Sequence, residues 1–140
     1  MVIQTASIEL NTRGENDIIN ITDEIDQLIR RANISEGSVL IFVPGATGAI
    51  STIEYEPGLI RDFPEIMETL IPQEKPYHHN QTWHDGNGHS HIRATLIGPS
   101  LTVPISSGRP VLGTWQQIVF LEFDNKPHRR NLFVQLTGEP

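Results

Sequence analysis

Four runs of strand-forming residues fill the last third of the chain, and they limit the fold more than any other feature of the sequence. They cover 91–98, 100–106, 114–124 and 130–138, and Gly, Pro, Asn or Ser residues bound them. Runs of this length and composition predict β-strands. The segment 124–128, DNKPH, predicts a hairpin turn between the last two runs. Strands joined by so short a turn are antiparallel, so we expect a largely antiparallel sheet.

The first half of the chain adds further strands. Strand-like runs cover 2–10, 17–21, 38–43 and 51–56. The run at 38–43, SVLIFV, is apolar throughout, which is typical of a central strand buried on both faces. A glycine-rich stretch follows it directly.

Two segments are expected to be helical. In 22–37 the apolar residues recur at positions i, i+3, i+4 and i+7, namely Ile25, Leu28, Ile29 and Ala32. This spacing places them on one face of a helix. The second segment is 58–72, in which Pro64 fits best in a first helical turn. The order of strands and helices predicts one α+β domain over residues 1–140, with largely antiparallel or mixed β-sheets in a sandwich-like core and two helices on one face.

The composition excludes several classes of protein and of site. The chain of 140 residues has no cysteine, so a metal would have to be held by His, Asp or Glu. No apolar run approaches the roughly 20 residues that span a bilayer, and the start of the chain does not resemble a secretory signal. The formal net charge of −7 disfavours nucleic acid as a partner. We therefore expect a cytoplasmic protein with no nucleic-acid and no membrane partner.

Histidines are concentrated in one window. Five of the six fall within residues 77–91, YHHNQTWHDGNGHSH, at positions His78, His79, His84, His89 and His91. His89 and His91 are two residues apart at the head of the strand predicted over 91–98. Side chains alternate along a strand, so both imidazoles are expected on the same face.

This arrangement predicts a metal site. Two imidazoles on one face can share a cation, and the third ligand would come from His79 or His84. Imidazole nitrogen suits zinc, nickel and copper. Three protein ligands leave one position open for water or substrate, as in catalytic sites. We expect His79, His89 and His91 to bind a divalent metal ion, with zinc as the best match and nickel or magnesium as alternatives. The alternative is a polar loop with ordinary hydrogen bonds.

Other polar residues are candidates for binding and catalysis. Arg93 continues the predicted histidine face, and its guanidinium matches phosphate geometry. Glu54 supplies a carboxylate, while Thr114 and Gln116 are expected to share one face and line a pocket. We expect Arg93, Glu54 and Gln116 to be catalytic, and Thr114 and Arg109 to bind the substrate.

The glycine-rich stretch after the buried strand is a further candidate. It contains Gly45-x-x-Gly48, and small residues allow backbone N–H groups to approach a phosphate. It lacks the lysine of a P-loop, so Walker-type nucleotide binding is not expected. A tight turn between two strands is the alternative.

Together these motifs resemble the YjbQ family, secondary thiamine-phosphate synthase-like proteins. Tyr77-x-His79 matches the first part of the family pattern, residues 91–93 (His-Ile-Arg) match the second, and residues 112–116 (LGTWQ) match the third. His89 belongs to a GNGHSH form that only part of the family shares. The resemblance, which runs over nearly the whole chain, implies an α+β fold, a cyclic homotrimer and a metal near the histidines at a subunit boundary. It also implies a weak thiamine-phosphate synthase activity.

One departure from the family pattern bears on catalysis. Many members carry HTTA or HTSA after the central strand. The matching stretch here is FVPGATGA, with Phe42 or Val43 where a histidine is usual. If that histidine acts in catalysis elsewhere in the family, this chain lacks it.

Three functions remain open from the sequence. The first joins a pyrimidine-methyl diphosphate to a thiazole phosphate with loss of pyrophosphate, where a metal and Arg93 would stabilise the departing charge. The second is a trimer that binds a metal or a small phosphorylated ligand without turnover. The third is metal-dependent hydrolysis by a metal-bound water.

Overall fold

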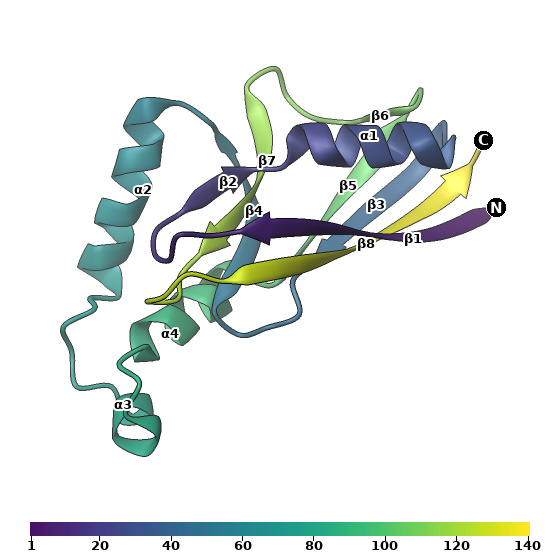
Figure 1. The fold of residues 1–140 in the computed structure, drawn as a ribbon. Coiled ribbons are helices and arrows are strands. Elements are labelled where there is room, and N and C mark those ends of the chain that lie inside the picture. The colour runs from purple at the N-terminus through teal and green to yellow at the C-terminus, as the bar shows by residue number, and fades with distance from the viewer.

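The larger of two β-sheets has five strands, all paired antiparallel. A computed structural model describes residues 1–140, and Figure 1 shows its fold. The strand order is β1 (Val2–Asn11), β8 (Arg129–Glu139), β3 (Glu36–Phe42), β5 (Ser100–Ser106) and β6 (Arg109–Pro110). The two longest strands, β1 and β8, place the chain termini side by side (Figure 1).

The smaller sheet has three antiparallel strands. Their order is β2 (Ile18–Asn20), β7 (Gln116–Glu122) and β4 (Gly48–Glu54). All pairs in both sheets are antiparallel, which confirms the α+β class with a largely antiparallel core.

Four helices accompany the sheets, two more than expected. They are α1 (Thr22–Ala32), α2 (Pro57–Leu70), α3 (His78–Trp83) and α4 (Gly88–Ile97). The first two match the predicted helical segments, although α2 begins earlier than its proline suggests and contains Pro64 in its interior. None of the four is long and apolar enough to span a bilayer.

The core is layered because the small sheet is buried on both faces. Strand β7 turns Ile118 and Phe120 toward the large sheet and α1, where they join a cluster of 17 buried apolar residues. It turns Val119 and Leu121 the other way, against α2 and α4, in a second cluster of seven. The alternation along one strand thus holds the two sheets and two helical layers together.

The histidine segment contradicts the expected secondary structure. Residues 91–98 were expected to be a strand, but most of them lie in α4, which starts at Gly88. The β-branched Ile92 and Thr95 favour a strand, yet the buried positions of the segment recur with helical spacing, at Gly88, His89, Ser90, Arg93 and Ala94. His89 and His91 therefore do not share a face, because residues two apart on a helix point in different directions.

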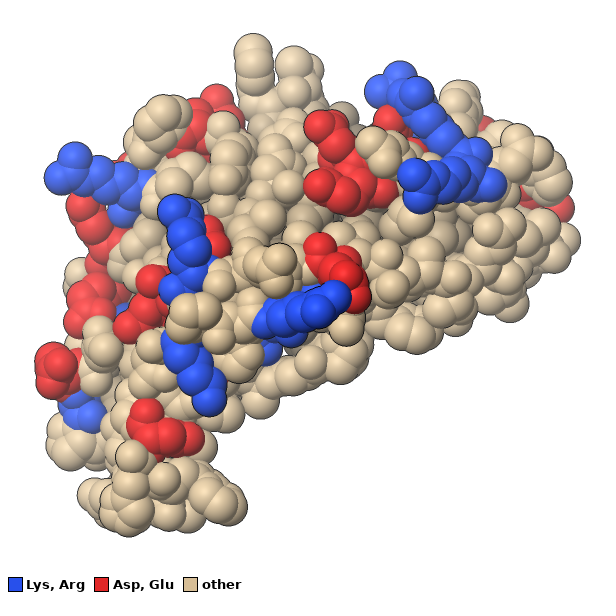
Figure 2. Space-filling view, viewed as in Figure 1, with Lys and Arg blue, Asp and Glu red and all other residues tan.

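Charged side chains of opposite sign are interspersed on the surface. On the face shown in Figure 2, Lys and Arg lie among Asp and Glu over α1 and α2, with no continuous basic area.

Candidate functional site

Helices α3 and α4 are locked together by a tight connection. The backbone N–H of Gly88 donates to Asn80 Oδ1 at 2.9 Å. A side chain at position 88 would lie 2.6 Å from Cβ of Tyr77, so only glycine permits this close approach. The connection also passes through left-handed backbone at His84 and Gly86. These constraints fix where α3 places His79 relative to α4.

His79 on α3 and His91 on α4 face each other. Their ring centroids are 4.4 Å apart, with the planes tilted by 46°. His79 Nε2 lies 3.0 Å from Asn87 Oδ1 and 3.3 Å from Asp85 Oδ1. Both neighbours are acceptors, so Nε2 carries the proton and the lone pair of His79 is on Nδ1. Burial lowers the pKa of His91, and the neighbouring His79 lowers it further. His91 is therefore neutral at neutral pH.

Asn87 connects this histidine pair to a second acid–base pair. Its Nδ2 donates to Asp124 Oδ1 at 3.2 Å, and Asp124 Oδ2 lies 2.5 Å from His128 Nε2. Burial alone would raise the pKa of Asp124. The hydrogen bonds from His128, Asn87 and the backbone of Asn125 outweigh it and hold this pKa below its ordinary value. Asp124 is therefore an ionised acceptor that orients both neighbours.

A buried ion pair continues the network beneath the loop between β3 and β4. Arg130 donates through Nε to Glu122 Oε1 at 2.9 Å, and its Nη2 donates to Glu122 Oε2 and to Thr47 Oγ1. Thr12 Oγ1 also donates to Glu122, at 2.7 Å. Thr47 Oγ1 in turn lies 3.4 Å from Asp124 Oδ2. We call Thr12, Thr47, Asn87, Glu122, Asp124 and Arg130 the buried polar network, because all six are buried.

A small cavity opens beside His91. It has a volume of about 150 Å³ and is lined by Gly45, Ala46, Gly48, His91, Ala94, Thr95 and Pro99. The glycine-rich stretch and His91, which follows Gly48 by 43 residues in sequence, therefore line one cavity. This cavity and the histidine pair, with the buried polar network beneath them, form the candidate site.

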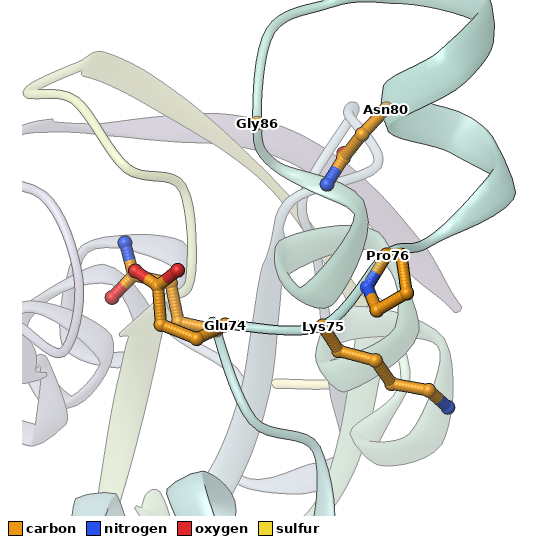
Figure 3. Close-up of a pocket in the computed structure, with 6 residues that line it drawn as sticks. Glu74, Lys75, Pro76, Asn80 and Gly86 are labelled. Atoms are coloured by element: carbon orange, nitrogen blue, oxygen red, sulfur yellow. The ribbon is translucent and has the colours of Figure 1, made fainter.

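A larger surface hollow lies elsewhere and is a poorer candidate. It measures about 420 Å³ and is lined by residues 73–76, Asn80 and Gly86. Figure 3 shows that Glu74 and Lys75 point apart rather than toward a common centre. Apart from the Pro76 ring, no apolar side chain lines it, whereas ligand pockets are mostly apolar with a few convergent polar groups.

His89 is separated from the other two predicted metal ligands. Its side chain is fully buried, and Nε2 lies 2.6 Å from Glu15 Oε2. Its Nδ1 has no hydrogen-bond partner. The expected trio of His79, His89 and His91 thus becomes a pair, because α4 turns His89 away from His91.

Arg93 is buried at a structural junction. It donates to the carbonyl oxygen of Ile71 through Nε and Nη2, to Asn16 through Nη1 and to Glu68 through Nη2. Its exposed fraction is 1%. These contacts join α4 to the end of α2 and to the loop after β1.

The remaining predicted site residues lie away from the histidine pair. Glu54 pairs with Gln116 in the register of β4 and β7. Strand β4 separates them from Gly48 by roughly 20 Å, at about 3.3 Å per residue. Gln116 donates to Thr52, Thr114 is exposed, and Arg109 Nε lies 3.6 Å from Asp26 on α1. Within one chain these residues are not part of the candidate site.

Sequence reasoning missed the residues that surround the histidine pair. Asp124 and His128 flank the predicted hairpin turn, and Arg130 precedes Leu132 and Val134 on the inward face of β8. The sequence did contain one signal for the buried ion pair. Arg130 falls in the alternating pattern of core positions, and a charged residue is buried only when it is paired.

The histidine pair fits a metal ion only in part. Nowhere does the chain group three or more His, Cys, Asp or Glu side chains in an arrangement that could hold a metal. His79 nevertheless is oriented as metal-binding histidines usually are, since one ring nitrogen donates to Asn87 Oδ1 and the other is left free. Two ligands fit, and the third predicted ligand does not.

Comparison with known proteins defines the family. The family model described as UPF0047 protein YjbQ-like matches residues 6–139. The chain belongs to this family. A UPF0047 protein of Archaeoglobus fulgidus is 42% identical over 128 residues, which cover 91% of this chain and 97% of the relative. A UPF0047 protein of Methanothermobacter thermautotrophicus is 35% identical over 100% of this chain and 96% of its own.

Solved structures confirm the YjbQ-like fold. A YbjQ-like protein of unknown function from Sulfolobus solfataricus superposes with a TM-score of 0.93 at 31% identity, covering 99% of both chains. A hypothetical protein from Aeropyrum pernix gives 0.90 at 32% identity, covering 97% of this chain and 99% of its own. The fold and the family predicted from the sequence are thus confirmed, and the function must be argued from the site.

Proposed function

We propose that this YjbQ-family protein binds a divalent metal ion through His79 and His91 and acts on a phosphorylated small molecule in the adjoining cavity. The facing imidazoles carry the proposal. His79 is held by Asn87 in the tautomer that leaves Nδ1 free, and the lowered pKa of His91 keeps it neutral. Neutral imidazole is the form that binds metal, and zinc is the best match, with nickel or magnesium as alternatives.

The surrounding residues suit proton transfer and orientation. A metal ion here would stabilise negative charge that develops on a phosphate oxygen. Asp124 orients His128, whose side chain is partly exposed and can exchange a proton with a bound ligand. Asn87 fixes His79 while it contacts Asp124, so the two pairs keep a constant relative position.

The specific reaction proposed is the one that the family resemblance supplies. It joins a pyrimidine-methyl diphosphate to a thiazole phosphate and releases pyrophosphate. Of the two alternatives, metal-dependent hydrolysis gives different products, and binding without turnover gives none. Pyrophosphate release that needs both thiamine precursors supports the first, while phosphate or alcohol release from a single compound supports hydrolysis.

Metal content tests the proposal directly. Zinc bound after reconstitution and dialysis should fall sharply in His91→Ala. The matched control is His78→Ala, which removes an exposed histidine from the same α3 helix that carries His79. His91→Ala with full zinc stoichiometry, or equal loss in both variants, would contradict the ligand assignment.

We further propose a cytoplasmic homotrimer. The outer face of the large sheet supports self-association, because Phe42 and Phe133 are register partners there and are 40% and 44% exposed. Ile3 on β1 is 65% exposed. Exposed apolar areas of this kind mark interfaces, and the family resemblance supplies the number three.

A further inference from the structure

Three successive backbone N–H groups of the loop between β3 and β4 have no acceptor within the protein. They belong to Gly45, Ala46 and Thr47; none of the three donates to a backbone or side-chain acceptor in the chain. Gly45 has a φ of +146°, a backbone conformation that side chains other than glycine rarely adopt. Successive unpaired N–H groups in a turn can bind an anion together.

Arg130 reaches the same loop from below. Its Nε and Nη2 are occupied by Glu122 and Thr47, but Nη1 has no acceptor in the chain. A Cβ at position 45 would lie 3.3 Å from this Nη1, so the free donor points at Gly45. The Arg130 side chain is 8% exposed. A largely buried guanidinium whose Nη1 is free to donate, next to free backbone N–H groups, can bind an anion.

The size of the cavity limits what it can hold. Its volume of about 150 Å³ is smaller than the about 300–1,000 Å³ of pockets that enclose drug-sized ligands. It therefore suits one functional group of a ligand rather than a whole molecule. His91 lines the same cavity, so a group bound there would lie beside the proposed metal ligand.

We propose that the backbone of residues 45–47 and Arg130 form a subsite for the phosphate group of the ligand. The guanidinium Nη1 and the loop N–H groups donate to its oxygens. Arg130 thus has the anion-binding role that the sequence predicted for Arg93. This inference deepens the proposed function and rests on it for the nature of the ligand, but the subsite consists of protein groups alone and does not require the metal.

Glu122 lowers the affinity of the subsite for phosphate. Its carboxylate already neutralises the charge of Arg130 through two hydrogen bonds. An incoming phosphate therefore meets a guanidinium with a competing partner, and weak, reversible binding is expected. Replacing Glu122 by an uncharged isostere should tighten phosphate binding, because the positive charge would then be unshared.

The first experiment uses the unmodified protein. The ¹⁵N-labelled chain in excess EDTA is titrated with inorganic phosphate and followed by amide NMR. Saturable shifts are expected at the amides of Gly45, Ala46 and Thr47. If those three amides stay unperturbed to saturation, or if shifts are confined to other regions, the subsite is overturned.

Matched variants test the part of Arg130. Replacing Arg130 alone would leave Glu122 as a buried unpaired charge and could unfold the protein, so Glu122→Gln is combined with Arg130→Gln. The double variant should bind phosphate about 10- to 100-fold more weakly than Glu122→Gln, as expected for loss of a charged hydrogen bond. Arg129→Gln is the control, because the adjacent exposed Arg129 pairs with Glu9 and loses the same charge.

The outcomes separate the two proposals. Equal affinity in the double variant and in Glu122→Gln, or an equal loss in Arg129→Gln, overturns the subsite. Phosphate binding at residues 45–47 in a protein that fails to bind zinc supports the subsite and contradicts the metal proposal. Zinc binding without phosphate binding at residues 45–47 supports the metal proposal and contradicts the subsite.

Discussion

At the residue scale, burial decides what each arginine near the site can do. Arg93 and Arg130 are both buried, but only Arg130 has a guanidinium nitrogen, Nη1, that donates to no acceptor in the chain. Every nitrogen of the Arg93 guanidinium group has an acceptor, including the carbonyl oxygen of Ile71, which ends α2. The sequence shows two arginines near histidines, but it does not show which donors are already used.

Arg93→Ala is therefore expected to act on stability. The substitution leaves the Ile71 carbonyl without its donor, a loss of about 1–3 kcal/mol in the free energy of unfolding. Urea unfolding measures this loss, and phosphate affinity per folded molecule should stay unchanged. Arg61→Ala is the control, since Arg61 pairs with Glu65 on the exposed surface of α2 and should cost under about 1 kcal/mol. If Arg93→Ala lost phosphate binding but kept its full stability, Arg93 would have to be assigned to the binding site.

Asp124 makes the stability of the protein depend on acid pH. Its pKa in the folded state lies below the ordinary value of about 3.9, so the folded state favours the ionised form. The resulting stabilisation is fully present above that ordinary value and is lost as the pH falls through the folded-state pKa. Asp124→Asn cannot titrate. Its free energy of unfolding should be lower at pH 7 and should decline less than that of the unmodified protein below about pH 4. Parallel denaturant curves from pH 7 to pH 2 measure this, and equal slopes would exclude Asp124 as the source.

At the element scale, the strands and the first two helices were predictable and the histidine segment was not. Strands β7 and β8 have alternating or continuous apolar positions and short turns, which are local signals. Segment 91–98 carries Ile92 and Thr95, which favour strands. Its helical form depends on contacts made at a distance: Ala94 packs against the small sheet, and Arg93 binds the end of α2. Such tertiary contacts override weak local preference.

The start of α2 illustrates the same limit on a smaller scale. Pro64 fits a first helical turn and suggested a later start. Glu56 instead caps the helix, because its carboxylate accepts the N–H groups of Gly58 and Leu59 at 2.8 and 2.6 Å. Pro57 occupies the first helical position, where a missing N–H is tolerated. The signal was present in the sequence as Glu56-Pro57, but the second proline obscured it.

The candidate site shows which part of a site a sequence can supply. The clustering of histidines and the glycine-rich stretch were visible as local features, and His91 and the glycine-rich stretch line the cavity. Asp124, His128 and Arg130 join the candidate site only because the hairpin between β7 and β8 folds beneath the loop between β3 and β4. Their separation of more than 75 residues from Thr47 leaves no local pattern.

At the scale of the whole molecule, the two faces of the large sheet differ. The inner face packs on α1 and the small sheet. The outer face is open and carries mainly uncharged side chains in its central part, including Leu40, Phe42, Pro104 and Phe133. Helix α2, by contrast, mixes its exposed Ile66 and Leu70 with exposed charged side chains, mostly acidic. The outer sheet face is the better candidate for contact between subunits.

Phe133→Asp should therefore dissociate the proposed trimer. A carboxylate placed beside Phe42 would have to be buried without a partner in the assembly, which is costly, whereas a single chain leaves the position exposed to water. Light scattering at micromolar concentration should give three times the chain mass of 15.7 kDa for the unmodified protein and the mass of one chain for the variant. Leu70→Asp, which adds the same charge at an exposed position of α2, should leave the trimer intact. A monomeric unmodified protein would refute the trimer, and dissociation by Leu70→Asp with an intact Phe133→Asp trimer would move the interface from the sheet to α2.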